Sequence, residues 1–285
     1  MRSEFKIGLG DTRIEIRCQD REFIQKALAD YRPFMVSGQP DFCIELNLRD
    51  KLTASEVKQL LLNSRSYLDG DRFFTEPELL ECSINWTEAT LRVDTEKELF
   101  APEVEYKLMN TLMRGIYSGI YKRVRNTALD AYLVQGCGIV NGKWCYLFMG
   151  PSGSGKTTIA RLANCRKVLN DEAVLIGRNR NKKGFYLSAT PFDGIASNRC
   201  NTVGHLSGIF FLKHDTEVSL RQLKKSETYR RFLTQVFDTS PLFELPGSES
   251  LSERADLSAE VATQVPSYEL GFRPDSSFWE AVENI

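Results

Sequence analysis

The chain has 285 residues, of which 42% are hydrophobic and 26% charged, a composition typical of a folded globular protein. It therefore excludes a disordered or fibrous protein, and the length accommodates one large domain or two smaller ones. The 37 basic residues nearly balance the 38 acidic ones, so no net positive charge favours a nucleic acid or an anionic membrane as partner. We expect two lobes, residues 1–101 and 102–285.

The N-terminus lacks the apolar core of a signal peptide, and no stretch approaches the roughly 18 apolar residues of a membrane span. We therefore expect a cytoplasmic protein without a membrane partner. The seven cysteines are widely spread, with no CxxC pair and only His205 and His214 as imidazole partners. This pattern predicts reduced, mostly buried thiols and no structural zinc.

The first lobe has the pattern of a mixed α/β unit. The segments 80–86 and 89–93 form a predicted hairpin, because two β-rich runs flank a short polar break. No motif reveals its role, so recognition of an acceptor and scaffolding are equal alternatives. Strands are expected at 4–7, 12–18, 42–48, 80–86 and 89–93, and a helix at 20–31.

The second lobe begins with a predicted helix at 102–125, because apolar residues recur at intervals of four behind a proline. A further predicted hairpin turns at Asn141-Gly142, a pair suited to the positive φ angles of tight hairpins. Residues from 246 have loop composition at their start. We expect strands at 129–134, 138–140, 144–149 and 209–213, a hairpin of 166–176 with 185–188, a helix at 220–236, and a closing strand and helix after 267.

Residues Gly150–Thr157 read GPSGSGKT and match the Walker A pattern between a predicted strand and a predicted helix. Glycines let the backbone curl around phosphate oxygens, and the helix N-terminus adds free amides and partial positive charge. Lys156 is expected to reach the β- and γ-phosphates of ATP, and Thr157 to direct its hydroxyl to Mg²⁺. The predicted nucleotide-binding residues are Gly150, Ser152, Gly153, Ser154, Gly155, Lys156, Thr157 and Thr158.

Asp171 and Glu172 follow Lys156 closely, in the otherwise apolar segment VLNDEAVLI that we predict as a strand. A buried carboxylate is costly without a cation, whereas one beside magnesium or a substrate hydroxyl serves as ligand or base. The alternative is a pair of acids at the solvent edge of a strand. The sequence lacks the NKxD motif of GTPases and the LSGGQ signature of transporter ATPases.

These pieces together resemble the C-terminal domain of the HPr kinase/phosphorylase family, which shares a nucleotide fold with phosphoenolpyruvate carboxykinase. The resemblance covers about residues 104–285. It is carried by GPSGSGKTTIARL, VLNDEAVLI, SATPFDG and SYELGFRPDSSFW beside the strand GIFFLK. It implies a mixed α+β protein: a P-loop nucleotide-binding domain of this type behind an N-terminal α/β lobe.

The resemblance also implies roles for single residues. Asp171 is the expected general base, acting with Lys156 as catalytic residues, and Glu172 helps to hold Mg²⁺ together with Thr157 and Asp171. Relatives usually carry two aspartates, so Glu172 is a departure and the two roles could be exchanged. Asp130 is a second departure, at a place where relatives commonly show a histidine; a turn or cap is the equal alternative for it.

Three further residues are weaker candidates. Asp193 stands near the place where relatives have another acid by the active site. Lys213 and Arg273 could clamp phosphate charge in a transition state, or pair with nearby acids at the surface.

The predicted activity is transfer of the γ-phosphoryl group of ATP to a hydroxyl, with serine as the acceptor that the resemblance implies. Whether that hydroxyl belongs to a protein, a peptide or a small molecule stays open. The rival hypotheses are a nucleotide hydrolase or switch, and a degenerate nucleotide binder without catalysis. Related kinases assemble into rings, and the sequence leaves a homo-oligomer open for this chain.

Overall fold

The computed structural model describes residues 3–285 apart from 11, 71, 86, 102–103, 105–107, 110–111, 113–130, 179–183, 193–199 and 237–250. The chain divides into two compact units, Met1–Leu129 with Asp238–Glu249 and Asp130–Phe237 with Ser250–Ile285. The helix expected at 102–125 lies mostly outside the described residues. It therefore stays a prediction, as does the lobe boundary between 101 and 102.

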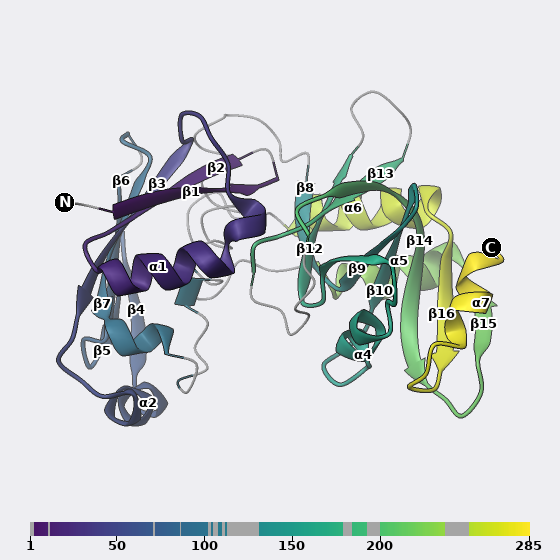
Figure 1. Ribbon diagram of the computed structural model, residues 1–285. Coiled ribbons are helices and arrows are strands. Elements are labelled where there is room, and N and C mark those ends of the chain that lie inside the picture. Colours follow the sequence, from purple (N-terminus) through teal and green to yellow (C-terminus); the bar gives the residue numbers. More distant parts are fainter. Residues whose placement is uncertain are drawn as a thin grey trace. The chain divides into compact units, whose positions relative to one another are not determined.

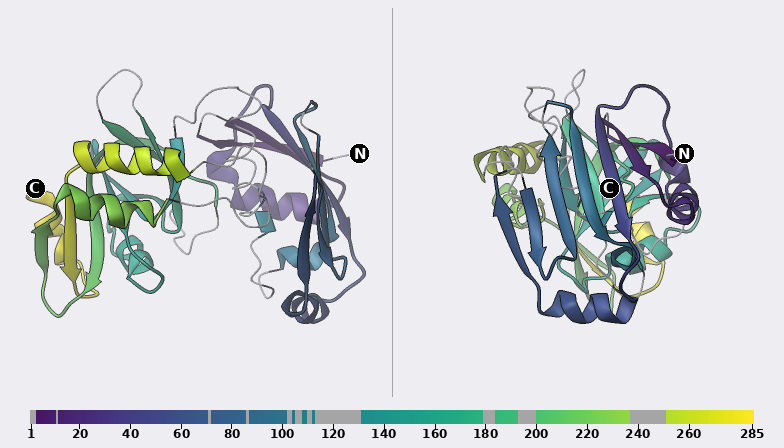
Figure 2. Two further views of the ribbon diagram at one scale, coloured as in Figure 1. Left: turned by 180° about the vertical axis from the view of Figure 1, so that it is seen from behind. Right: turned by 90° about the vertical axis from the view of Figure 1, so that its left-hand side faces the viewer.

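The first unit contains a seven-stranded sheet in the order β1-β2-β3-β7-β6-β5-β4 (Figure 1). The pairs β2–β3 and β3–β7 are parallel and the others antiparallel. The right-hand view of Figure 2 looks onto this sheet, with α2 across one end of the strands. The elements are β1 Ser3–Leu9, β2 Thr12–Cys18, α1 Arg21–Asp30, η1 Arg32–Phe34, β3 Phe42–Arg49, α2 Ala54–Leu62, β4 Arg65–Asp69, β5 Arg72–Glu76, β6 Leu80–Asn85, β7 Thr90–Glu96 and η2 Lys97–Phe100.

The helices α1 and α2 begin at side-chain caps. The Asp20 carboxylate accepts from the backbone N–H of Phe23 at the start of α1, and Thr53 and Glu56 form a capping box at the start of α2. The expected helix, the strands and the hairpin β6–β7 are confirmed. The sequence prediction missed α2, β4 and β5, which are short or polar and therefore give a weak periodic signal.

The second unit contains a nine-stranded sheet whose main path runs β11-β9-β10-β14-β13-β12-β8, with β16 beside β14 and β15 beside β16. The mixed α/β class is therefore confirmed. The elements are β8 Ala131–Gln135, β9 Cys137–Asn141, β10 Trp144–Met149, α4 Lys156–Arg161, β11 Lys167–Asn170, β12 Ala173–Arg178, β13 Phe185–Ser188, β14 Val203–His214, β15 Ser219–Gln222, α5 Lys225–Leu233, α6 Leu251–Gln264, β16 Ser267–Phe272 and α7 Phe278–Glu283.

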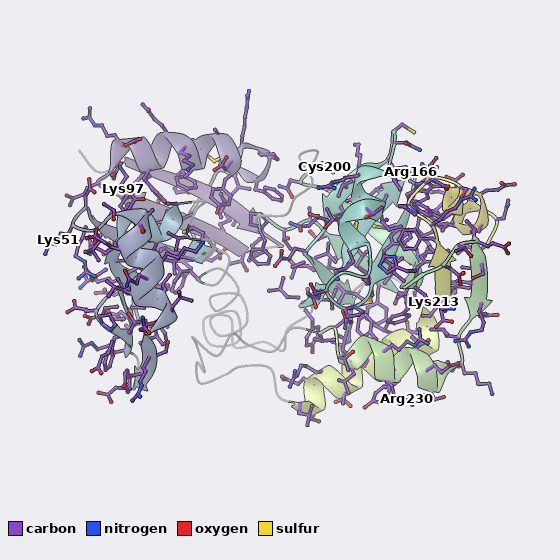
Figure 3. The ribbon with its side chains drawn as sticks, turned by 90° about the horizontal axis from the view of Figure 1, so that it is seen from below. Lys51, Lys97, Arg166, Cys200, Lys213 and Arg230 are labelled. Atoms are coloured by element: carbon purple, nitrogen blue, oxygen red, sulfur yellow. The ribbon has the colours of Figure 1, made fainter. Side chains whose placement is uncertain are left out.

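Helices cover both faces of this sheet. The short helix α4 lies on one face, and α5 and α6 pack together on the other (Figures 1 and 3). On the α4 side the core is aromatic: Phe148 stacks on Phe210 with ring centroids 5.1 Å apart, and both are fully buried. The indole N–H of Trp279 in α7 donates to the backbone oxygen of Leu162 at 2.8 Å, which fixes the end of α4.

Two expectations for this unit are corrected. The helix expected at 220–236 begins only at Lys225, because Ser219–Gln222 pairs with β16 as the strand β15. The segment 166–176 is two strands, β11 and β12, and only β12 forms the expected hairpin with β13. The loop expected at the start of residues 246–260 falls mainly on residues outside the described part of the chain, and the helix α6 that follows at Leu251 was not predicted.

All seven cysteines are free thiols and five of them are buried, with Cys165 exposed and Cys200 half-buried. None of the helices in the described part of the chain combines the length and the apolar character that a membrane crossing requires.

Candidate functional site

The glycine loop begins where β10 ends, at an edge that several strands share. Met149 of β10 is in register with Phe211 of the parallel strand β14, and His214 is in register with Phe272 of the parallel strand β16. The carboxyl ends of all three strands therefore meet at one edge of the sheet. Ligands of α/β proteins bind at such edges, because chain that leaves the sheet there is free to form loops.

The fourth strand at this edge is β11, and the two acids follow it in the chain. Gly138 of β9 is in register with Leu147 of β10 on one side and with Asn170 of β11 on the other. Asp171 and Glu172, which follow Asn170, are thus brought beside the glycine loop. They lie in the turn between β11 and β12 and not within a strand, which corrects the sequence prediction.

Two glycines shape the loop. Gly153 and Gly155 have φ angles of 78° and 102°, a left-handed conformation that glycine adopts without steric cost. A Cβ atom on Gly155 would lie 2.5 Å from the Cζ atom of Phe272, so a side chain has no room there. The helix α4 that follows has only six residues, so the loop itself supplies most of the backbone amides that a phosphate could meet here.

Donors of the loop converge on its own carbonyl oxygens. The backbone oxygen of Pro151 accepts from the Ser154 N–H at 3.1 Å and from the Lys156 ammonium at 2.9 Å. Lys156 also donates to the backbone oxygen of Gly150 at 2.6 Å. An amide and an ammonium that share one oxygen acceptor form the arrangement that a phosphate oxygen would fill.

Ser154 has a buried and unpaired hydroxyl. Its side chain is 7% exposed, and its Oγ atom is buried without a hydrogen-bond partner. A buried hydroxyl left in this state costs about 1–3 kcal/mol, a cost that the folded loop bears.

Lys156 also has a distinct electrostatic environment. Burial lowers the pKa of its ammonium from the ordinary value, and the neighbouring Glu172 and Asp171 carboxylates oppose that shift. Partial desolvation therefore disfavours the charged form of Lys156. An anion bound beside it would offset this cost.

Asn170 holds the acidic turn in place. Its amide nitrogen donates to the backbone oxygens of Phe192 at 2.9 Å and Thr190 at 3.4 Å. Its side-chain oxygen accepts from the backbone N–H groups of Glu172 at 2.7 Å and Ala173 at 3.3 Å. Asn170 is fully buried, so these bonds are shielded from water and fix the directions of the two acids that follow.

A cavity of about 390 Å³ joins the loop to the acids. It brings together most of the predicted site residues, with Asp171 buried and Glu172 half-buried in its wall. Gly150 and Ser154 are buried and do not line the cavity. The lining residues are Gln135, Ser152, Gly153, Gly155, Lys156, Thr157, Thr158, Asp171 and Glu172.

Two of the weaker candidates, Lys213 and Arg273, do not join this group. Lys213, labelled in Figure 3, pairs with Asp215 at 3.3 Å, and Arg273 pairs with Asp275; neither cation lines the cavity. Asp130 and Asp193 lie outside the described residues.

The sequence analysis missed two residues that contact the site, besides Asn170. Gln135 ends β8 and lines the cavity beside the acids. His214, considered above only as a zinc ligand, places its Nε2 atom 2.7 Å from the backbone oxygen of Gly153. Both stand at strand ends, and this position was the only signal that the sequence offered.

The second unit is thus a mixed α/β unit with a glycine-rich loop and two acids at one edge of its sheet. A scan against protein-family models finds no match to the chain, and a search of curated proteins finds none either.

Proposed function

We propose that the second unit is an ATP- and magnesium-dependent kinase of the HPr-kinase-like P-loop type, which transfers a phosphoryl group to a hydroxyl. The observation that carries the proposal is that one cavity is lined by the loop together with Lys156, Asp171 and Glu172. Such a cavity combines donors for a polyphosphate with carboxylates for a cation and a proton.

The residues present fit a triphosphate. The Ser154 amide and the Lys156 ammonium already share one oxygen acceptor in the loop. On binding, these donors would exchange the Pro151 carbonyl for phosphate oxygens, which are stronger acceptors because they carry charge.

The cavity also offers hard oxygen ligands for magnesium, namely the hydroxyl of Thr157 and the carboxylates of Glu172 and Asp171. Within the described residues, no three His, Cys, Asp or Glu side chains gather as a metal cluster. Mg²⁺ usually takes one or two carboxylates and completes its shell with water and substrate phosphates. When bound, it would neutralise charge on the β- and γ-phosphates.

Asp171 is the proposed general base. Its carboxylate takes the proton of the acceptor hydroxyl while the acceptor oxygen bonds to the γ-phosphorus, and the bond to the bridging oxygen breaks with release of ADP. Lys156 stabilises the negative charge that spreads over the transferred group. Serine is the acceptor that the resemblance favours.

The test is incubation of the protein with Mg²⁺ and γ-labelled ATP together with free serine, serine-containing peptides or cell extract. Label on an acceptor hydroxyl, absent with Lys156→Ala, would support the kinase. Label found only as free phosphate would favour a hydrolase. Binding of ATP with neither product above the Lys156→Ala level would indicate a degenerate binder and refute the kinase.

A further inference from the structure

His214 is the last residue of β14 and reaches the glycine loop from outside. Its Nε2 atom lies 2.7 Å from the backbone oxygen of Gly153. A carbonyl oxygen only accepts hydrogen bonds, so Nε2 must carry the proton in this contact.

The bonded carbonyl determines where the next amide points. The C=O of Gly153 and the N–H of Ser154 belong to one trans peptide and therefore point in opposite directions. The carbonyl faces His214 outside the loop, and the amide donates inward to Pro151 O at 3.1 Å. The contact with His214 thus keeps the Ser154 amide directed at the place where Lys156 also donates.

On the Gly153 side, open space adjoins this peptide. A Cβ atom on Gly153 would have no heavy atom within 4 Å, so the tip of the loop is open. Turning this peptide over rotates ψ of Gly153 and φ of Ser154, and the absence of a Cβ atom on Gly153 widens the range of its ψ angle. A reversed peptide would aim the carbonyl of Gly153 at the phosphates and remove a donor.

The imidazole itself is supported. Its ring stacks on Phe272 of β16, with centroids 6.0 Å apart and an angle of 27° between the planes. Phe272 is buried and also fills the space beside Gly155. His214 is therefore attached to the sheet and can hold the loop.

We propose that His214 is a positioning residue for polyphosphate binding, which anchors the Gly153–Ser154 peptide so that its amide faces the ligand. This inference rests on the proposed function insofar as the loop binds phosphates. It assigns no catalytic step to the histidine.

Two variants separate the donor from the ring. His214→Phe keeps an aromatic ring on Phe272 but has no donor, whereas His214→Gln keeps an N–H donor near the same place without the ring. Calorimetry with Mg²⁺ and either ATP or pyrophosphate should give binding about tenfold weaker for His214→Phe, the equivalent of one hydrogen bond. Both ligands should be affected alike, because the defect lies in the loop. His214→Gln should stay within about threefold of the wild type.

Amide exchange without ligand gives an independent readout. The Ser154 amide should exchange faster in His214→Phe than in the wild type or His214→Gln, since its peptide is no longer anchored. Lys213→Ala is the matched control: this exposed neighbour pairs with Asp215, and both readouts should stay at the wild-type level.

The outcomes distinguish the two proposals. Failure of the wild type to bind ATP and pyrophosphate would reject the phosphate site, while the exchange measurement would still test the anchor. A wild type that binds, with His214→Phe unchanged in affinity and exchange, would overturn only the role of His214. Equal weakening of ligand binding by His214→Phe and His214→Gln would overturn the role of the N–H donor.

Discussion

Gly155→Ala is expected to destabilise the second unit by two separate effects. At φ 102° a residue with a Cβ atom costs about 1–2 kcal/mol relative to glycine. The new Cβ would also lie 2.5 Å from Cζ of Phe272, a ring that is 2% exposed and enclosed by the core. Overpacking of this kind costs about 1–3 kcal/mol. The free energy of unfolding should fall by about 2–5 kcal/mol in total.

Gly142→Ala isolates the first effect. Gly142 has a φ of 60°, and a Cβ atom there would meet nothing within 4 Å. It should therefore cost only the backbone contribution of about 1–2 kcal/mol. Urea unfolding followed by circular dichroism and tryptophan fluorescence measures both variants.

A double-mutant cycle tests the steric effect directly. Phe272→Ala should cost less in the Gly155→Ala background than in the wild type, because removal of the ring relieves the clash. Equal losses for Gly155→Ala and Gly142→Ala, together with no coupling to Phe272, would refute the packing argument.

Three further predictions concern the charged and polar groups of the site. Lys156→Met should abolish phosphoryl transfer. Because burial lowers the pKa of Lys156, the folded wild type binds fewer protons than the unfolded chain just below pH 10.5, and the free energy of unfolding should rise there with pH. In urea titrations the pH profile of the variant should be flatter than that of the wild type. Asp171→Asn should slow transfer by about 10²–10⁴ with ATP affinity retained, and an unchanged rate in the labelling assay would place the base elsewhere. Asn170→Ala should lower the free energy of unfolding by about 2–4 kcal/mol, because it leaves buried backbone groups unpaired. Its control is Asn141→Ala, whose side chain makes an exposed bond to Glu283 and should cost under about 1 kcal/mol; similar losses for both would contradict the role of Asn170.

The sequence by itself determined the features that depend on neighbouring residues. The apolar run before Gly150 predicted β10, and Asn141-Gly142 predicted the hairpin of β9 and β10 that the register confirms. The helix α1 likewise begins at its cap Asp20. Propensity, periodicity and capping act over a few residues, so a single sequence contains them in full.

Only the tertiary structure decided which distant residues meet at the loop. His214 contacts Gly153 across 61 positions, and Asn170 reaches Phe192 across 22. The same limit explains why residues 220–222 of β15 were mistaken for part of a helix, since their strand conformation depends on pairing with β16. Contacts of this kind follow from the order and register of strands, and strand pairing overrides local propensity because it fixes where each side chain lies.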